Sequence, residues 1–115
     1  MPLERGDIYL VNLNPVQGRE QAGRRPVLVL SVNAINRLPL VVTVVIGTKG
    51  ENVARDYPTN VRVSSAESGL PMETVFLGFQ LRSLDPARFA GPPAGKVSGL
   101  TLNKIETAVR HCLGL

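Results

Sequence analysis

The stretch TVFLGFQLRSL, residues 74–84, carries the clearest β-strand pattern in the chain. Its apolar residues recur at every second position, which is typical of a strand that buries one face. The predicted apolar face carries Val75, Leu77, Phe79 and Leu81, and the opposite face carries Gly78, Gln80 and Arg82. Because Gly78 has no side chain, we expect room for a ligand beside it. The alternative is an ordinary polar outer face with a glycine tolerated at a bulge.

Four further strands are predicted upstream of this one. Residues Gly6–Leu13 and Asn60–Ser64 alternate between two faces, as a partly exposed strand does. Residues Pro26–Val32 and Leu40–Ile46 are apolar at consecutive positions, so we expect both segments to be buried on both faces. Turn residues such as Gly18, Gly23, Gly50 and Ser68-Gly69 separate the segments.

One helix is predicted near the end of the chain. Apolar residues recur there at helical spacing, at Leu102, Ile105, Val109, Cys112 and Leu113. Gly114 follows as a stop signal, and either Ser98 or Thr101 suits the N-cap. Before the helix, Asp85-Pro86 favours a short helical turn through Phe89, and Gly91–Gly95 is too rich in Gly and Pro for regular structure.

These elements predict a mainly β fold of the α+β class. Five short, closely spaced antiparallel strands tend to curl into a small barrel or half-barrel, and the C-terminal helix would pack on it. With 115 residues and 43% hydrophobic residues, the chain suits one domain, residues 1–115, around one core. We find no internal repeat and no linker.

Composition and charge indicate which partners and which cellular location suit the chain. Formal net charge is +4, and ten of the thirteen basic residues are arginine, whose planar fork matches phosphate. This balance is compatible with a nucleic acid or an acidic protein as partner. Charged residues Glu4, Arg5 and Asp7 argue against a signal peptide, and the apolar run Leu38–Gly47 is too short for a membrane span. We therefore expect a cytoplasmic protein with no membrane partner.

The most unusual segment is VQGREQAGRRP, residues 16–26. It is expected to place five polar or charged side chains in one loop between two strands: Arg19, Glu20, Gln21, Arg24 and Arg25. Gly18 and Gly23 let the backbone approach a ligand closely, and Pro26 biases the residue before it to an extended conformation. The alternative is a solvated surface loop whose charges serve solubility.

A hydroxyl stands where the third predicted strand ends. Thr48 follows the apolar run and precedes Lys49-Gly50, so it could face a groove formed by neighbouring strand ends. It could equally be a β-branched residue that finishes a strand. Other chemistries are poorly represented, because the chain has a single histidine, His111, and no metal-ligand spacing. Catalysis in this chain would have to rely on Arg, Glu, Thr and Gln side chains, without a cofactor.

Three ordered blocks resemble the MazF/PemK family of toxin ribonucleases. The opening RGDIYLVNLNPVQGREQAGRRPVLVLS, residues 5–31, resembles the family's N-terminal signature, and FQLRSLD, residues 79–85, resembles its second signature. Between them, VVIGTKG ends a strand in a threonine, as the family's middle motif does. The closing helix with its LGL ending also fits the family pattern.

The resemblance implies a strongly curved antiparallel sheet of the CcdB/PemK type, similar to SH3-like barrels. It puts the catalytic arginine at Arg25 and the catalytic Ser/Thr at Thr48, while Glu20 is the chemically easier general base. It matches Gln80 to the glutamine of the second signature and Glu20-Gln21 to the acidic-amide pair of the first loop. We expect RNA binding by Arg19, Gln21, Arg24, Lys49, Tyr57, Gln80 and Arg82. No metal site is implied, and the loop from Lys49 to Pro58 is where we expect substrate selectivity.

The activity implied is metal-independent cleavage of single-stranded RNA, such as mRNA. In the family's reaction the RNA's own 2′-hydroxyl attacks the adjacent phosphate, which leaves a 2′,3′-cyclic phosphate and a 5′-hydroxyl. The implied assembly is a homodimer restrained by a MazE-like antitoxin with an acidic segment. Two other functions stay open: a non-catalytic module of the same fold, either a CcdB-like topoisomerase poison or an inactive antitoxin-binding homologue, and a structural SH3-like adaptor.

Overall fold

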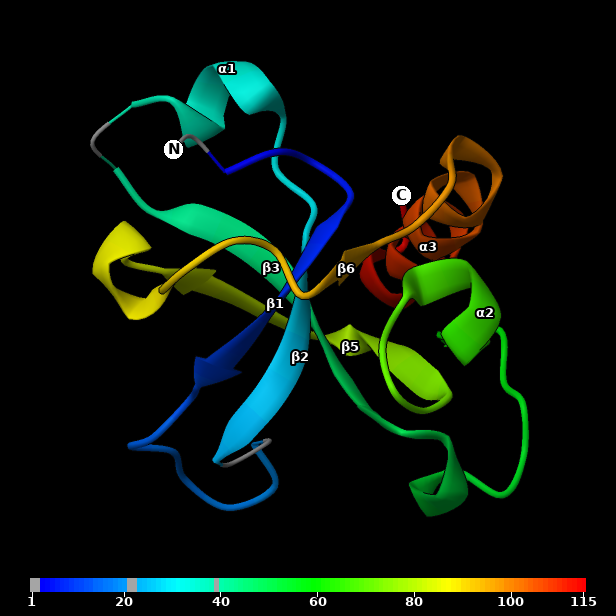
Figure 1. Cartoon of the computed structure of the whole chain (residues 1–115). Coiled ribbons are helices and arrows are strands. Elements are labelled where there is room, and N and C mark those ends of the chain that lie inside the picture. The colour runs from blue at the N-terminus through cyan, green and yellow to red at the C-terminus, as the bar shows by residue number, and fades with distance from the viewer. Residues whose placement is uncertain (1–2, 21–22, 39) are drawn as a thin grey trace.

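The fold is a single curled sheet. The computed structural model describes residues 3–20, 23–38 and 40–115. Its strands are β1 (Asp7–Asn12), β2 (Arg24–Val29), β3 (Val42–Lys49), β4 (Asn60–Val63), β5 (Thr74–Leu84) and β6 (Gly95–Lys96). All neighbouring strands run antiparallel in the order β4-β5-β3-β2-β1-β6, and the sheet curls into a half-barrel (Figure 1). The predicted antiparallel, strongly curved sheet with a C-terminal helix is confirmed.

The helices lie outside this sheet. They are α1 (Asn33–Asn36), α2 (Ser65–Ser68) and α3 (Gly99–Leu113), with 3-10 turns η1 (Gly50–Asn52) and η2 (Pro86–Arg88). Ser98 is the N-cap of α3, because its hydroxyl accepts a hydrogen bond from the Thr101 backbone N–H at 3.2 Å. Gly114 ends the helix with a left-handed φ of 70°. The helix packs on β4 and β5.

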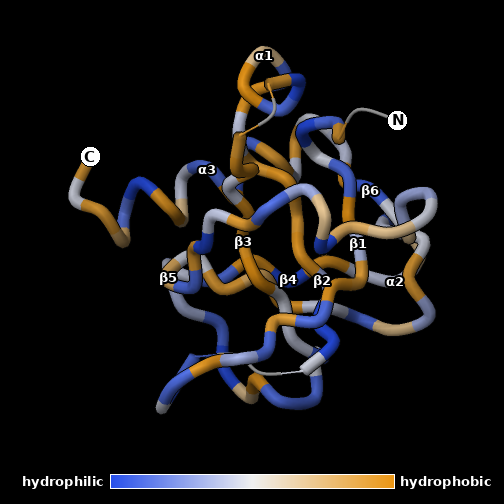
Figure 2. The backbone as a smooth tube through the Cα atoms, turned by 90° about the vertical axis from the view of Figure 1, so that its left-hand side faces the viewer, coloured by the Kyte–Doolittle hydropathy of each residue, from blue (hydrophilic) through white to orange (hydrophobic). Residues whose placement is uncertain are grey.

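The sheet is buried on both faces. Alternate residues of a strand point to opposite faces, so Val27 and Val29 join one core cluster while Leu28 joins the other. The second cluster lies beneath α3 and includes Ile105 and Val109. Figure 2 shows hydrophobic segments gathered in the central strands and hydrophilic ones in the outer connections. This burial on both faces confirms the expectation for Val27–Val29 of the apolar segment that became β2, but the prediction is wrong at Val32, which lies beyond the strand and is 54% exposed.

The bounds of the first four strands differ from the sequence predictions, most of all those of β2 and β3. β2 begins at Arg24 because it pairs with β1 as far as Asn12. β3 begins at Val42, which lies opposite the last residue of β5. Leu40 and Val41 were expected to be buried, but no strand continues beside them and they are 57% and 50% exposed.

The long strand β5 has the predicted bounds, but the predicted apolar face is wrong at Phe79. Ile46 pairs with Leu77, and Val45, its neighbour in β3, pairs with Leu81. Residues 78–80 therefore have no partner in β3 and form a bulge, which interrupts the alternation of faces. As a result Phe79 is 56% exposed, and Phe76 is buried in its place.

One strand, β6, and two short helices, α2 and α1, were not predicted, and neither was the 3-10 turn η1. β6 pairs with β1 through the end of the Gly- and Pro-rich segment that was expected to be irregular. The short helix α2 is framed by Ser64 as N-cap and by Gly69, whose φ is 81°. The single turn α1 has no side-chain cap. Within the described ranges, no helix is both long and apolar enough to cross a membrane.

Candidate active site

A hollow of about 590 Å³ opens between the strands and the segment that follows β3. Its size falls in the range of sites for small ligands. The lining residues come from β2, β3, β4, β5 and the connection between β3 and β4: Arg25, Thr48, Asn52, Val53, Ala54, Arg55, Tyr57, Asn60, Leu77 and Phe79. The hollow thus brings together the arginine and the threonine singled out from the sequence, and adds Tyr57 from the loop expected to govern selectivity.

Thr48 is the penultimate residue of β3 and is 5% exposed. Its hydroxyl oxygen accepts a hydrogen bond from the Asn52 side-chain amide at 3.0 Å. A hydroxyl carries one proton and two lone pairs, so accepting from Asn52 leaves its proton free to donate. Thr48 is therefore oriented as a hydrogen-bond donor beside the hollow.

Arg25 lies in β2, opposite Val11 of β1, and is partly buried. Its Nε is buried and has no hydrogen-bond partner among the described residues. A buried donor without a partner is costly and uncommon, and it marks a place where an external acceptor would be favourable. In this hollow a phosphate oxygen is the acceptor that a guanidinium fits best.

Arg24 and Lys49 line a second, smaller hollow beside the first. This hollow has a volume of about 190 Å³ and a largely apolar lining: Leu10, Arg24, Arg25, Pro26, Lys49, Leu70, Pro71, Met72 and Thr74. Among the described residues, only Arg25 belongs to both hollows. Of the arginines in the first motif, Arg25 therefore lines both hollows, Arg24 lines only the smaller one and Arg19 lines neither.

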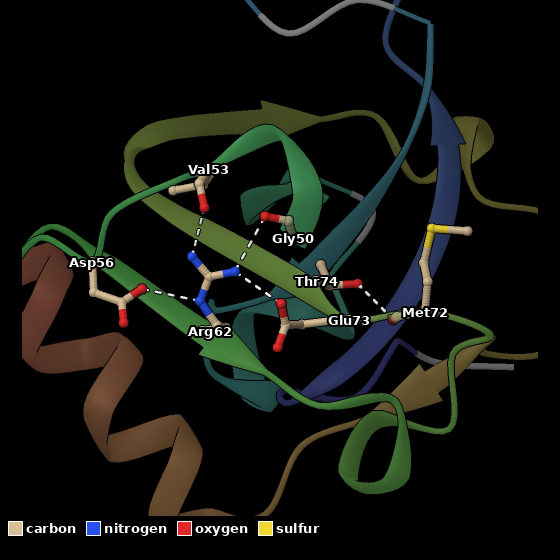
Figure 3. A network of polar contacts seen from close by, with 7 residues as sticks. All are labelled: Gly50, Val53, Asp56, Arg62, Met72, Glu73 and Thr74. Atoms are coloured by element: carbon tan, nitrogen blue, oxygen red, sulfur yellow. Dashed lines mark hydrogen bonds and ion pairs between the residues drawn. The ribbon is translucent and has the colours of Figure 1, made fainter.

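The outer wall of the larger hollow is fixed by Arg62 of β4 (Figure 3). Its guanidinium donates to the Asp56 and Glu73 carboxylates, at 3.0 and 2.8 Å. It also donates to the backbone carbonyls of Gly50 at 3.1 Å and Val53 at 2.7 Å. Hydrogen bonds to Glu73 and then to Asp56 raise the pKa of Arg62 above its usual value. The segment between β3 and β4 is consequently held by both side-chain and backbone contacts.

The tip of the loop after β1, residues 17–20, is bound by fewer hydrogen bonds from the rest of the molecule. Glu20 is exposed, its carboxylate accepts a hydrogen bond from the Gln17 backbone N–H, and it does not line the larger hollow. The carbonyl of Arg19 accepts from Gln80 at 3.3 Å. Gln21, predicted to bind RNA, lies outside the described residues. The prediction that all five polar residues share this loop is wrong for the last two, because Arg24 and Arg25 belong to β2.

The expected ligand space beside Gly78 is filled. A Cβ at this position would lie 2.6 Å from the carbonyl oxygen of Thr59 and 3.2 Å from the backbone of Ala108. Arg82 donates to the Leu13 carbonyl at 2.8 Å, so part of its guanidinium holds the end of the first strand segment. Gly78 therefore allows the bulge to pack closely against the backbones of Thr59 and Ala108. Gln80, the other polar-face residue, donates to a carbonyl of the loop after β1.

Sequence reasoning missed several residues of the site. Asn52 and Arg55 line the hollow, and Arg62 supports it from behind. Arg62 had the pattern of an ordinary exposed strand position, and its role depends on partners that are 6 to 12 residues away in the chain. Phe79 was assigned to the buried face because the bulge leaves no trace in the hydrophobic pattern. Across residues 3–20, 23–38 and 40–115, no group of three or more His, Cys, Asp or Glu side chains is placed to hold a metal ion.

Comparisons with known proteins place this geometry in context. The family model described as PemK-like, MazF-like toxin of type II toxin–antitoxin system matches residues 4–113. An Endoribonuclease MazF from Staphylococcus saprophyticus is 34% identical over 113 residues, covering 98% of this chain and 92% of the relative.

Two solved structures are similar over nearly the whole fold. MazF from Deinococcus radiodurans has a TM-score of 0.82 and 27% identity, with 100% of this chain and 99% of that chain covered. An endoribonuclease in complex with its cognate antitoxin, from Mycobacterial species, has a TM-score of 0.78 and 29% identity, with 98% and 96% covered.

Proposed function

The chain belongs to the family of PemK-like, MazF-like toxins of type II toxin–antitoxin systems, and from this premise we propose that its hollow is a ribonuclease active site. It is an endoribonuclease of the MazF type, as the name of its full-length relative indicates. That relative's name favours an enzyme over a non-catalytic module such as a CcdB-like poison or an inactive antitoxin-binding homologue.

We propose that Arg25 and Thr48 act on the phosphate that is cut. The 2′-oxygen of the RNA attacks the phosphorus while the bond to the 5′-oxygen breaks, giving a 2′,3′-cyclic phosphate and a 5′-hydroxyl. Negative charge grows on the non-bridging oxygens, where preorganised donors have their largest effect. The observation that carries the proposal is that Arg25, whose buried Nε has no partner in the described structure, lines the same hollow as Thr48.

The reaction also needs a base for the 2′-hydroxyl proton. An arginine stays protonated at neutral pH, so Arg25 is poorly suited to this task. We propose Glu20, whose carboxylate is exposed and bound only by local backbone in the free protein. Its loop would have to close over bound RNA, and Gln80 already connects that loop to β5.

The remaining polar residues are proposed to hold the rest of the RNA. Arg19, Arg24, Lys49 and Arg82 would contact phosphates, together with Arg55, which lines the hollow. Gln21 and Gln80 would contact RNA from the first loop and the bulge, and Tyr57 would stack on a base. Phosphate contacts of this kind make binding weaken as salt concentration rises.

We further propose that catalysis needs no metal ion. The described lining of the larger hollow has two guanidinium groups and no carboxylate or imidazole, a donor set suited to phosphate rather than to a cation. We propose single-stranded RNA such as mRNA as the substrate. Because mRNA is translated in the cytoplasm, the protein would act there.

An antitoxin is the expected protein partner, since one similar endoribonuclease is described in complex with its cognate antitoxin. We propose that an acidic segment of a MazE-like antitoxin occupies the basic hollows, and that the toxin is a homodimer. A solution mass of twice the 12.4 kDa chain would support the dimer, and a mass equal to one chain would refute it.

Primer extension on a long RNA, with and without EDTA, tests the activity. We expect the same cuts in both conditions, with 5′-hydroxyl and cyclic phosphate ends. A matched RNA with a 2′-deoxy nucleotide at one cut site should resist cleavage at that site only. Loss of activity in EDTA would overturn metal independence, and cleavage at the deoxy site would overturn attack by the 2′-oxygen.

A further inference from the structure

The bulge of β5 presents a large aromatic ring in the larger hollow. Phe79 is 56% exposed, although Phe76 in the same strand is 1% exposed. A single exposed apolar residue is ordinary on a protein surface. Phe79 differs because it lines the hollow that also contains Arg25 and Thr48.

The bulge is held in place by backbone contacts. The Gly78 N–H donates to the Thr59 carbonyl at 2.7 Å, and no side chain would fit between this glycine and that oxygen. The Tyr57 carbonyl, two residues earlier, accepts a hydrogen bond from the Asn60 N–H at 2.9 Å. The segments carrying Phe79 and Tyr57 are therefore connected to each other and fixed relative to the hollow.

Both rings are available to a ligand. Tyr57 is 53% exposed and lines the same hollow as Phe79. The aromatic pair recorded among the described residues is Tyr9 with Phe89, in another part of the molecule, so neither ring of the hollow stacks on a second ring. Exposed aromatic faces beside a phosphate-binding cation are typical of single-stranded nucleic-acid sites.

We propose that Phe79 and Tyr57 form a nucleobase subsite that stacks on the bases flanking the scissile phosphate. This inference rests on the proposed function and adds Phe79 as a residue that positions RNA. Arg25 and Thr48 act on the phosphate, while the rings take the bases on either side of it and so set which phosphate enters the site. Stacking accepts any base, so the rings supply affinity and register, and sequence preference comes from the polar lining, including Asn60.

The first test measures binding to a single-stranded oligonucleotide that carries one cut site. Methylation of the 2′-oxygen at that site makes the oligonucleotide uncleavable. We expect Phe79→Leu to weaken binding by roughly tenfold, because stacking on one base contributes about that much. Phe79→Tyr keeps the ring and should bind within about twofold of the parent. Leu100→Ala, an exposed apolar change on α3 outside the hollow, is the matched control and should change nothing.

An abasic nucleotide then isolates the stacking contact. Oligonucleotides lacking the base on one side or the other of the cut should bind the parent protein about tenfold more weakly. With the abasic nucleotide at the position that Phe79 contacts, Phe79→Leu should cause no further loss, because the two changes remove the same contact. Tyr57→Leu should show the same behaviour on the other side of the cut.

A spectroscopic readout is also available, because the chain has no Trp and two Tyr. Tyr9 is buried in the core, so quenching of tyrosine fluorescence by bound RNA should come from Tyr57 and should vanish in Tyr57→Phe. Circular dichroism would verify that each variant is folded.

The inference is overturned if Phe79→Leu and Tyr57→Leu bind RNA and select cut sites as the parent does. It is also overturned if Phe79→Leu weakens antitoxin binding and leaves RNA binding intact, since the ring would then serve a protein partner. Failure of the proposed function is a separate result, in which the parent protein itself does not cut RNA.

Discussion

Two connections border the active-site region, and they are held very differently. The loop after β1 is bound at its base, where Arg82 and Arg88 donate to the carbonyls of Leu13 and Asn14, but its tip, residues 17–20, is exposed and is bound by Gln80 and by its own backbone. The connection from β3 to β4 lines the hollow and is held by three hydrogen bonds from Arg62, whose fourth goes to Glu73 just before β5. Catalytic groups act most strongly when they are preorganised. We therefore assign the electrostatic part of catalysis to the anchored side, which is this connection together with Thr48, to which Asn52 donates. Glu20 of the loop after β1 would contribute only after bound RNA brings it to the hollow.

The largest effect among the following variants is expected on the anchored side, at Thr48. Thr48→Val keeps the shape of the side chain and removes the donor, and should slow single-turnover cleavage by roughly a hundredfold or more. Thr48→Ser retains the hydroxyl and should remain within about tenfold of the parent. Equal rates for the valine and serine variants would contradict the role of the hydroxyl.

The hydrogen bond between Asn52 and Thr48 offers a finer test of the anchored wall. In Asn52→Asp an ionised carboxylate can only accept, so the Thr48 hydroxyl would donate to it and turn its proton away from the phosphate. We expect a rate about thirtyfold below the parent, and a smaller loss in Asn52→Ala, where the hydroxyl stays free. If Asn52→Ala cleaves more slowly than Asn52→Asp, the proposal that the Thr48 hydroxyl accepts from Asn52 and donates to the phosphate is refuted.

On the loose side, Glu20→Gln should slow cleavage by about tenfold, which is less than a well-placed general base contributes. The reason is that the carboxylate does not line the hollow before RNA binds. The rate constant at saturating RNA is the measurement, because it separates chemistry from binding. An unchanged rate would show that Glu20 takes no part in the mechanism. A larger loss of rate than in Thr48→Val would show that the loop after β1, rather than the anchored side, contributes most to catalysis.

Removing Arg62 should make the anchored connection resemble the loose one. Arg62→Ala should lower the cleavage rate by about fivefold, since bound RNA can restore part of the wall's order. It should also lower the melting temperature by about 5 °C. Arg62→Lys can keep a carboxylate contact but not the whole set of four bonds, and should fall between alanine and the parent. Arg110→Ala, a change at an exposed arginine of α3, is the control and should match the parent.

The sequence was most informative about local periodicity. Alternation over Thr74–Leu84 gave the bounds of β5, and helical spacing with Gly114 gave the end of α3. These patterns depend on residues two to four positions apart. Burial depends on what lies opposite, so Leu40 and Val41 were assigned to the core although no strand reaches them.

The candidate site was predicted only where motif residues are themselves in the hollow, at Arg25, Thr48 and Tyr57. Their proposed roles still await test. Phe79 could not be found from the sequence, because the bulge arises from a register shift between two strands. Arg62 could not be found because its partners, Asp56 and Glu73, come close only after β4 and β5 pair.

The most direct test of the central claim is the single-turnover cleavage rate of Arg25→Ala on one oligoribonucleotide in EDTA, beside the parent protein. If Arg25, which lines the hollow and whose Nε has no partner in the described structure, binds the scissile phosphate, the variant should be folded by circular dichroism and at least a hundredfold slower. A folded Arg25→Ala protein that cuts the same phosphate at the parent's rate would contradict the account and require a different site for the chemistry.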